Sequence, residues 1–406
     1  MAGPLSGLRV LDLSRILAGP WCTQILADLG AEVIKVERPG TGDDTRAWGP
    51  PFLRRPDGTE TRDSAYFTAT NRGKKSVTLD IASAEGQDLA RSLAAHCDVM
   101  IENYKFGDMK RYGLDYEKLA AMNPRLVYCS ITGFGQTGPY RERAGYDFMI
   151  QAMGGLMSVT GERDDLPGGG PQKCGVPIAD MMAGMYSAVA IVSALMERVT
   201  SGRGQNIDMS LLDTQVSWLA NHNLNYLVSG ELPKRWGNAH PNLTPYRAFP
   251  TKDGNLILAI GNDGQFRRFC EVAGLVIATD PRFVDNRARL GNRDEIVAIV
   301  ALAMKTRTTG EWMAALEAEG VPCGPINTID QVFRDPQVIE RGLRFDLPHR
   351  EAGSVPQVAN PIRFSRSRIE YRSAPPVLGE HTHQVLGELL GMAPNEVASL
   401  KDRGVV

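Results

Sequence analysis

One acidic residue stands out because of its surroundings. Asp180 lies within the segment GVPIADMM, so its neighbours along the chain are apolar. A carboxylate in such a segment could act as a nucleophile if the start of the following helix and nearby backbone N–H groups keep it ionised. The alternative is structural, because Asp is also favoured as a helix N-cap. The residues of this segment leave both interpretations open.

Basic and amide side chains recur near the ends of predicted strands. These positions are Arg38, Lys74, Lys75, Asn103, Lys105, Arg111 and Arg143. Each one taken singly is more often a surface charge than a ligand contact. Several of them follow strands whose carboxyl ends meet at one edge of a parallel sheet, and this favours a phosphate-bearing cofactor there.

Residues 7–38 predict the unit that positions these groups. Two apolar runs flank an amphipathic stretch, which predicts a strand, a helix and a second strand with a right-handed crossover. The predicted elements are residues 8–13, 18–29 and 31–37. The second strand ends at Glu37 and Arg38, where a dinucleotide fold binds the ribose and an arginine can bind an additional phosphate. Residues 14–19 are SRILAG and lack the glycine fingerprint, so we expect adenosine 3′-phosphate rather than NAD.

Alternating strands and helices continue after this unit. Further strands are predicted at residues 76–79, 98–102, 125–132 and 206–209, and helices at residues 84–95 and from Phe148. This alternation predicts an α/β fold with a mostly parallel, doubly wound sheet.

A glycine-rich segment, GFGQTG at residues 133–138, matches the spacing of the dinucleotide fingerprint directly after a predicted strand. A true fingerprint opens a helix and is followed by an acidic strand end about twenty residues later. Here Pro139 and several charged residues follow, without the periodic apolar residues of a helix. We therefore predict a glycine loop and no dinucleotide site.

The length of 406 residues and a change of composition predict more than one domain. We expect residues 1–225 to form most of a large domain, residues 226–325 a small α+β domain, and residues 326–406 a C-terminal segment. In that segment strands are predicted near residues 343–347 and 361–364, and a last helix at residues 383–390. The apolar run 181–196 is shorter than the ~18–20 residues that span a bilayer, so we expect a buried helix.

Composition excludes several classes of protein. A net charge of −2 gives no electrostatic case for nucleic acid or an anionic membrane as a partner. The six cysteines are scattered, without a CxxC pair or a Cys/His cluster, which argues against a metal site or a disulfide framework and suits a reducing cytoplasm. The first residues show no secretory signal. No histidine stands at motif spacing from a nucleophile, so a hydrolase triad is not predicted.

Long blocks of this sequence resemble the class III coenzyme A transferases, also called the CaiB/BaiF or formyl-CoA transferase-like family. The matching blocks are VLDLSRILAGPWCTQILADLGAEVIKVERPGTGDDTR, ENYKFG, SITGFGQTGPYRERAGYD and GVPIADMMAGMYS, and the resemblance runs nearly end to end. Three further blocks are similar to the succinyl-CoA:glutarate CoA-transferase branch: ERPGTGDDTRAWGPPF, KRWGNAHPNLTPYRAF and GVPCGPIN.

This resemblance implies a fold, an assembly and a site. It implies a Rossmann-like large domain completed by the C-terminal segment, a small domain, and an interlaced homodimer with each active site at the dimer interface. The nucleophile of the family falls on Asp180. The CoA-contacting positions fall on Leu17, Ala18, Arg38, Leu79, Asn103, Tyr104, Lys105, Arg111, Tyr146 and Asp147. The mobile glycine loop falls on Gly261, Asn262, Asp263, Gly264 and Gln265, where this chain has GNDGQ instead of an all-glycine version.

The implied chemistry needs CoA as substrate and product, but neither a metal nor a general base. A carboxylate can attack the acyl-CoA thioester, giving an acyl-aspartyl anhydride and then an aspartyl-CoA thioester. A closing loop would exclude water, which hydrolyses the anhydride. A dicarboxylic acid acceptor, such as glutarate, also needs a cation for its far carboxylate, and Arg46, Arg235 and His240 are the candidates.

Two alternatives stay open at this point. The α-methylacyl-CoA racemases of the same superfamily have GHD where this chain has Gly145, Tyr146 and Asp147. A tyrosine with an ordinary pKa of ~10 is a poor base near neutrality, which disfavours proton transfer. The other alternative is a non-catalytic CoA- or nucleotide-binding protein, which would have no use for Asp180.

Overall fold

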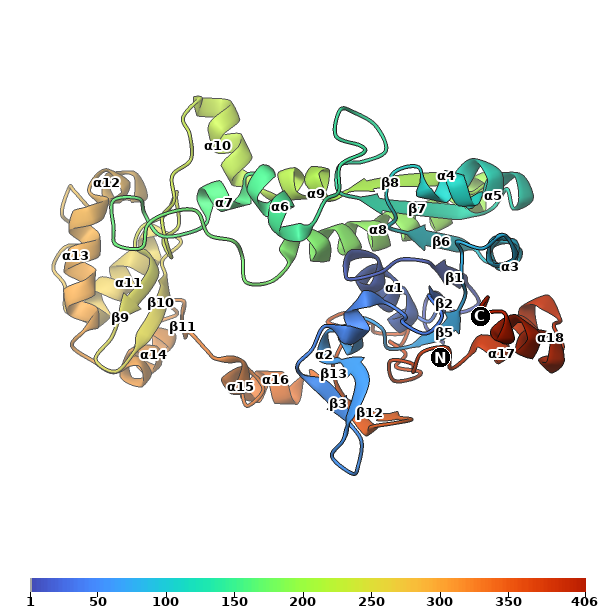
Figure 1. Ribbon diagram of the computed structural model, residues 1–406. Helices are drawn as coiled ribbons and strands as arrows, with labels where there is room; N and C mark the ends of the chain where they lie inside the picture. The colour runs from blue at the N-terminus through green and yellow to red at the C-terminus, as the bar shows by residue number, and fades with distance from the viewer. Residues whose placement is uncertain (1) are drawn as a thin grey trace. The chain divides into compact units, whose positions relative to one another are not determined.

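The computed structural model describes residues 2–406 and divides into two compact units (Figure 1). Unit 1 contains the chain up to Leu156, then Cys174–Leu224 and Gln337–Val406. Unit 2 contains Met157–Lys173 and Asn225–Pro336. The chain therefore enters unit 2 twice, and its C-terminal segment returns to unit 1.

Unit 1 is built around a six-stranded sheet in which every neighbouring pair of strands is parallel. Its strands are β1 (Arg9–Asp12), β2 (Glu32–Glu37), β5 (Lys74–Thr78), β6 (Val99–Glu102), β7 (Val127–Thr132) and β8 (Asn206–Ser210). Their order across the sheet is β5-β2-β1-β6-β7-β8. The chain runs outward from β1 to one edge and from β6 to the other, which confirms the predicted doubly wound α/β fold.

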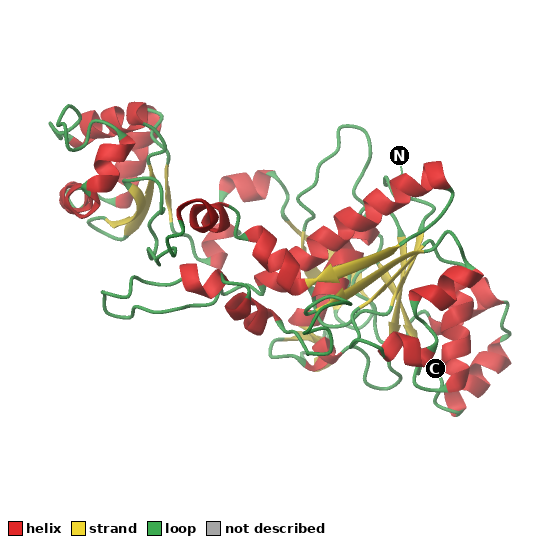
Figure 2. Cartoon of the chain, turned by 90° about the horizontal axis from the view of Figure 1, so that it is seen from above, coloured by secondary structure: helices red, strands yellow, loops and turns green. Residues whose placement is uncertain are grey.

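Helices cover both faces of the sheet, because alternate strand residues point to opposite sides (Figure 2). In β1, Val10 belongs to the core formed with α1 (Ala18–Asp28) and α8 (Ile178–Ser201). Leu11 belongs to the opposite core, formed with α3 (Ala84–Ala95) and the C-terminal helices. These last helices are α17 (Thr382–Leu390) and α18 (Pro394–Asp402).

Short elements connect the main ones in unit 1. They are the 3₁₀ helix Asp44–Ala47, the hairpin β3 (Phe52–Arg54) and β4 (Glu60–Ser64), α2 (Ala65–Thr68), α4 (Asp108–Tyr112), α5 (Tyr116–Met122), α6 (Asp147–Met153) and α9 (Leu211–Trp218). Three helices, α7 (Leu156–Val159), α10 (Asn221–Ser229) and α16 (Pro336–Glu340), lie where the chain passes between units.

Unit 2 has its own core, built on a three-stranded antiparallel sheet. The strands are β9 (Tyr246–Pro250), β10 (Asn255–Ala259) and β11 (Cys323–Pro325), and the helices are α11 (Asp263–Ala273), α12 (Asn286–Gly291), α13 (Arg293–Met304), α14 (Thr309–Ala318) and α15 (Ile329–Val332). Large aromatic side chains such as Phe249, Phe266 and Trp312 fill the space between sheet and helices.

The C-terminal segment differs from prediction in two places. Residues 361–364 form no strand; β12 (Arg344–His349) instead pairs with β13 (Gly353–Val358). Pro356 inside β13 weakens the sequence signal for that strand, since proline cannot donate to a ladder. Helix α18 follows the helix predicted to be last. Its signals are Pro394 in the first turn and Glu396, whose carboxylate accepts the N–H of Ala393.

The long apolar helix α8 is not buried along its whole length, contrary to the prediction. It has 24 residues, and Val189, Met196 and Val199 are 60%, 72% and 79% exposed. Within residues 2–406 it is also the one helix whose length and composition would allow it to span a membrane, a property that core helices of soluble proteins share. Its opposite side, with Ala183, packs in the core of unit 1. An apolar stripe therefore remains uncovered by unit 1.

Candidate active site

The strand order reverses between β1 and β6, and in α/β folds the ligand crevice lies at the carboxyl ends of such a pair. The loops that follow these two strands line one pocket in unit 1. Eight of the residues singled out in the sequence line it together: Leu17, Ala18, Asn103, Tyr104, Lys105, Arg143, Tyr146 and Asp180. Residues from distant segments of the chain thus meet at the predicted edge of the sheet.

Asp180 lies in the first turn of α8, but it is not the N-cap of that helix. Pro177 occupies the N-cap position. In the part of the chain that the structure describes, residues 2–406, no hydrogen bond or ion pair reaches the Asp180 carboxylate. Burial, together with the nearby charge of Asp147, raises the pKa of Asp180 to about 7. The carboxylate therefore faces a pocket without a structural partner.

Asp147, at the start of α6, is the residue that caps α8. Its Oδ1 accepts the backbone N–H of Ala179 at 2.8 Å, and its Oδ2 accepts Nε2 of Gln151 at 2.7 Å. These contacts leave Asp147 outside the lining of the pocket. Asp147 thus fixes the start of the helix that carries Asp180 and adds a negative charge beside it.

The proximity of Asp147 and Asp180 predicts that the activity depends on pH. A carboxyl group attacks only when ionised, so with a pKa of about 7 for Asp180 activity should fall as pH falls through 7. Asp147→Asn removes the like charge and lowers the pKa of Asp180, so we expect the acid limb of kcat/KM to move to lower pH. Activity at pH 6 relative to pH 8 would then be higher than in the wild type. An unchanged acid limb would show that Asp147 does not act on Asp180 through its charge.

Two close backbone contacts hold the walls of the pocket together. A Cβ atom on Gly184 of α8 would lie 2.5 Å from the carbonyl oxygen of Ala18, so only glycine lets α1 and α8 approach this closely. A Cβ atom on Gly133 would lie 2.5 Å from Cα of Gly145, which closes the loop between them at its base. The predicted glycine loop therefore forms a wall of this pocket.

Asn103, at the end of β6, binds the neighbouring loop through its side chain. Its Oδ1 accepts the N–H of Arg15 at 2.8 Å, and its Nδ2 donates to the carbonyl of Arg15 at 2.7 Å. Glu102 lies below it, where its carboxylate accepts the N–H of Tyr104 at 2.8 Å. Burial raises the pKa of Glu102 to about 7, with hydrogen bonds from Ser130 and Tyr104 opposing this.

Four cationic residues line this pocket together with Asp180. They are Arg15, Lys105, Arg141 and Arg143. Arg15 and Arg141 were not singled out in the sequence, and only their place in the fold identifies them. Arg141 and Arg143 lie over the rings of Phe106 and Tyr140, at 4.8 and 3.9 Å from the ring centroids. Such a surface suits the phosphate groups of a large anionic substrate.

Arg38 and Leu79 lie beside this pocket, in a smaller one that shares Arg15 and Tyr104 with it. The Arg38 side chain is half exposed and pairs with Asp44, whose other oxygen binds Arg15 at 3.0 Å. Arg111 lines neither pocket; it is exposed and pairs with Asp108 at 3.1 Å.

The basic segment at the start of β5 does not form a phosphate site. Lys74 is buried and donates to Asp12 at 3.2 Å, and burial lowers its pKa to about 8. Lys75 pairs with Glu32 at 2.7 Å on the outer side of the sheet. The two lysines that suggested a phosphate site therefore form ion pairs within the chain.

The three candidates for binding a far carboxylate all have partners inside the chain. Arg46 is 3% exposed and binds Glu37 and Asp63, so its guanidinium has no free side. In unit 2, Arg235 pairs with Asp164 and donates to the carbonyl of Ser158. His240, also in unit 2, accepts the N–H of Asn242 through Nδ1 at 3.0 Å.

The segment GNDGQ forms the turn between β10 and α11 in unit 2. Asn262 is the N-cap of α11, and its Oδ1 accepts the N–H of Gln265 at 2.9 Å. Gln265 in turn accepts the N–H of Gly261 at 2.8 Å, and Asp263 pairs with the buried Arg289 at 2.7 Å. Gly264 lies within the first turn of the helix. This chain thus has a capped helix start where a run of glycines would have none.

Comparisons with known proteins identify the family of this chain. A family model described as CoA-transferase family III matches residues 5–382. The chain is 52% identical to succinate–glutarate CoA-transferase of Agrobacterium fabrum over 95% of the chain and 96% of that protein, and 42% identical to succinyl-CoA:glutarate CoA-transferase of Mus musculus over 99% and 90%. The crystal structure of a CAIB/BAIF family protein from Brucella suis is similar with a TM-score of 0.84 and 51% identity, covering 96% of this chain and 100% of that one.

Proposed function

Because the chain belongs to CoA-transferase family III, we propose that it moves CoA from succinyl-CoA to glutarate with Asp180 as the nucleophile. One observation carries the assignment of the nucleophile. Asp180 presents a carboxylate without a partner to a pocket that otherwise offers cations, and these are the two kinds of group that an acyl-CoA ester requires.

Each step is an acyl transfer between oxygen and sulfur. The ionised Asp180 attacks the thioester carbonyl of succinyl-CoA, forming an anhydride and releasing CoA thiolate. The thiolate attacks the Asp180 carbonyl of the anhydride, which forms an aspartyl-CoA thioester and releases succinate. Glutarate then attacks this thioester, and the returning thiolate takes the glutaryl group, which restores Asp180. Carboxylate and thiolate are nucleophiles already, so the steps as written need no general base.

We assign residues of unit 1 to these steps. Asp180 lies in the first turn of α8, where the helix dipole favours negative charge on the oxygens of its carbonyl as it is attacked. Lys105, Arg141 and Arg143 provide charges for the diphosphate of CoA. Arg46 has no free donor for the far carboxylate of a dicarboxylic acid.

The test uses the whole enzyme with succinyl-CoA and a panel of acids, with CoA products read by mass spectrometry. Glutaryl-CoA is expected from glutarate, and hydroxylamine added with succinyl-CoA should convert Asp180 to its hydroxamate in the peptide containing GVPIADMM. The Asp180→Asn variant is the control for the adduct. A racemase would instead exchange the α-proton of a 2-methylacyl-CoA with deuterated solvent, and that result without an adduct would overturn the proposal.

Arg38 is proposed to bind the 3′-phosphate of CoA, at the rim of the small pocket beside Leu79 and Tyr104. Arg38→Ala should raise the KM for succinyl-CoA by about 10-fold or more and change kcat by less than about 2-fold, because the contact is the same in ground and transition states. The exposed Arg54, paired with Glu60, gives the matched control Arg54→Ala. Equal KM values for succinyl-CoA and its dephospho form in the wild type would contradict this role.

A homodimer and a cytoplasmic location are also part of the proposal. The uncovered stripe on α8 supports the dimer, since Met185, Val189, Met196 and Val199 recur at helical spacing and are exposed within unit 1. We expect Val189→Lys to shift the sedimentation coefficient from that of a dimer toward that of a monomer. Val276→Lys, at an isolated exposed valine in unit 2, is the control. A wild-type monomer, or no difference between the two variants, would contradict a dimer through α8.

A further inference from the structure

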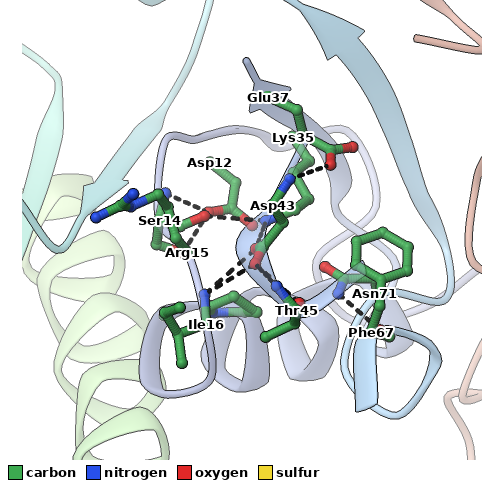
Figure 3. Close-up of polar contacts among 12 residues, drawn as sticks. Asp12, Ser14, Arg15, Ile16, Lys35, Glu37, Asp43, Thr45, Phe67 and Asn71 are labelled. Carbon is green, nitrogen blue, oxygen red and sulfur yellow. Dashed lines mark hydrogen bonds and ion pairs between the residues drawn. The ribbon is translucent and has the colours of Figure 1, made fainter. Parts of the chain in front are cut away.

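The loop from β1 to α1 has its backbone held by side chains from other elements. Residues Ser14, Arg15 and Ile16 present five consecutive backbone groups, from the N–H of Ser14 to the N–H of Ile16, and each contacts a side chain. Asp12 accepts the N–H of Ser14 at 2.9 Å, and Lys35 donates to its carbonyl at 2.9 Å. A loop of this kind takes its conformation from the surrounding side chains (Figure 3).

The remaining three groups are bound from two other directions. Asn103 binds both the N–H and the carbonyl of Arg15, as described above. The N–H of Ile16 donates to both carboxylate oxygens of Asp43, at 3.3 Å to each. Asp43 comes from the loop after β2 (Figure 3). With Asp12 of β1 and Asn103 after β6, side chains from three strand ends therefore converge on this short segment.

Ile16 adopts a backbone conformation that β-branched residues rarely adopt. Its φ is +70°, and Ile16 is one of two non-glycine residues with positive φ among residues 2–406. Steric overlap makes this region unfavourable for isoleucine, so the conformation persists only where surrounding contacts impose it. The hydrogen bond to Asp43 is the contact made by Ile16 itself. The structure therefore identifies Asp43 as the residue that holds Ile16 in place.

Asp43 is well suited to this role, because an ion pair and several hydrogen bonds fix the position of its carboxylate. It is 3% exposed, and Lys35 donates to its Oδ2 at 2.9 Å. Its Oδ1 accepts the N–H and the hydroxyl of Thr45 at 3.0 and 2.8 Å, and its own N–H donates to Glu37. A carboxylate held in this way cannot turn away from Ile16.

The strained segment leads directly into the active-site pocket. Ile16 and the following residue, Leu17, line it together with Asp180. Leu17 is 5% exposed, and its carbonyl accepts the first backbone hydrogen bond of α1, from Trp21. Two apolar residues thus line the pocket where the proposed anhydride forms, and their position depends on the backbone of Ile16.

We propose that Asp43 is a positioning residue that, through the N–H of Ile16, holds Ile16 and Leu17 in the pocket so that water is excluded from the aspartyl anhydride. This rests on the proposed function. In the reaction to be prevented, water attacks the succinyl carbonyl of the anhydride and the bond from that carbon to the Asp180 oxygen breaks. Of the two protons of the water, one goes to the CoA thiolate and the other to solvent. The net change is hydrolysis of succinyl-CoA to succinate and CoA, without CoA reaching glutarate.

The test compares Asp43→Asn with the wild type, measuring free CoA thiol and glutaryl-CoA in the same reaction. We expect the hydrolysed fraction of turnovers to rise about 10-fold. Asp57→Asn is the matched control, because the exposed Asp57 accepts the N–H and hydroxyl of Thr59 as Asp43 does those of Thr45. Thr45→Val removes one hydrogen bond to Asp43 and keeps the buried charges, so a smaller rise is expected there, even if Asp43→Asn is unstable.

A rescue separates this role from a merely structural one. Glycine adopts a φ of +70° without strain, so Asp43→Asn should change the hydrolysed fraction by less than about 2-fold in an Ile16→Gly background. In an Ile16→Ala background, which shortens the side chain but keeps the strain, it should raise that fraction as in the wild type. Equal effects in the two backgrounds would overturn the proposal.

Hydrogen–deuterium exchange provides a readout that does not depend on activity. The amide of Ile16 should exchange faster in Asp43→Asn than in Asp57→Asn. A wild-type enzyme that makes no acyl-CoA product would refute the proposed function, whereas the exchange of Ile16 would still report on the contact with Asp43. Transfer by the wild type, with an unchanged hydrolysed fraction in both Asp43→Asn and Thr45→Val, would refute only the present inference.

Discussion

Replacing Asp180 with asparagine is expected to lower the turnover of CoA transfer by roughly 1,000-fold or more, because an amide cannot form the anhydride. Binding of CoA should persist, since the cations of the pocket belong to other segments of unit 1. The variant should also fold, because no hydrogen bond or ion pair within residues 2–406 depends on the Asp180 carboxylate. Initial rates with succinyl-CoA and glutarate measure the turnover, and calorimetry measures the binding of CoA.

The matched control is Asp213→Asn. Asp213 occupies the third position of α9, as Asp180 does in α8, but it lies outside the pocket. Asp213→Asn should leave turnover within about 2-fold of the wild-type value. This control tests the general effect of removing an acidic residue from the first turn of a helix. If Asp180→Asn kept a tenth of the wild-type rate, Asp180 would stabilise the helix and another group would have to carry the acyl transfer.

Replacing Gly184 with alanine is expected to have the second largest effect. The new Cβ atom would lie 2.5 Å from the carbonyl oxygen of Ala18 and 3.1 Å from the Trp21 side chain. Backbone cannot yield as a flexible side chain does, so α1 must move away from α8. Overpacking of this kind typically destabilises by about 1–3 kcal/mol. A displacement of ~1 Å between Leu17 and Asp180 can lower the rate about 100-fold.

The expected result is therefore a large fall in kcat with a moderate fall in melting temperature. Gly310→Ala is the control, because Gly310 lies in α14 and a methyl group added there would point into open space. That change should be neutral or stabilise by up to ~1 kcal/mol. A Gly184→Ala enzyme with unchanged kcat would show that the separation of α1 and α8 does not position the site.

The hydrophobic periodicity of the sequence was sufficient to predict the main helices and strands of unit 1. The predicted helix at residues 84–95 is α3 without change, and the strand predicted at residues 98–102 differs from β6 by one residue. These elements could be predicted because apolar runs and caps lie within a few residues of one another. The acidic residue in GVPIADMM was also identifiable locally, since a charge among apolar neighbours is unusual.

The family model and the sequence relatives confirmed the class of enzyme, but the role of single polar residues depended on distant partners. Lys74 looked like one of several surface cations, yet it lies buried against Asp12, 62 positions away. Arg46 is similarly occupied by Glu37 and Asp63. The sequence shows that a charged residue is present. The free-energy cost of burying that charge is offset only by a partner that the fold brings close to it.

The amino-acid sequence by itself determined the strands of the six-stranded sheet, the helices α1 and α3, the family and the candidate nucleophile. Only the tertiary structure decided that Asp147 caps α8 across 32 positions and that Asp43 holds Ile16 across 27. It also decided that one side of α8 stays uncovered by unit 1. The physical reason is that local periodicity reflects interactions within one element, whereas these contacts form only after strand order brings remote loops to one edge of the sheet.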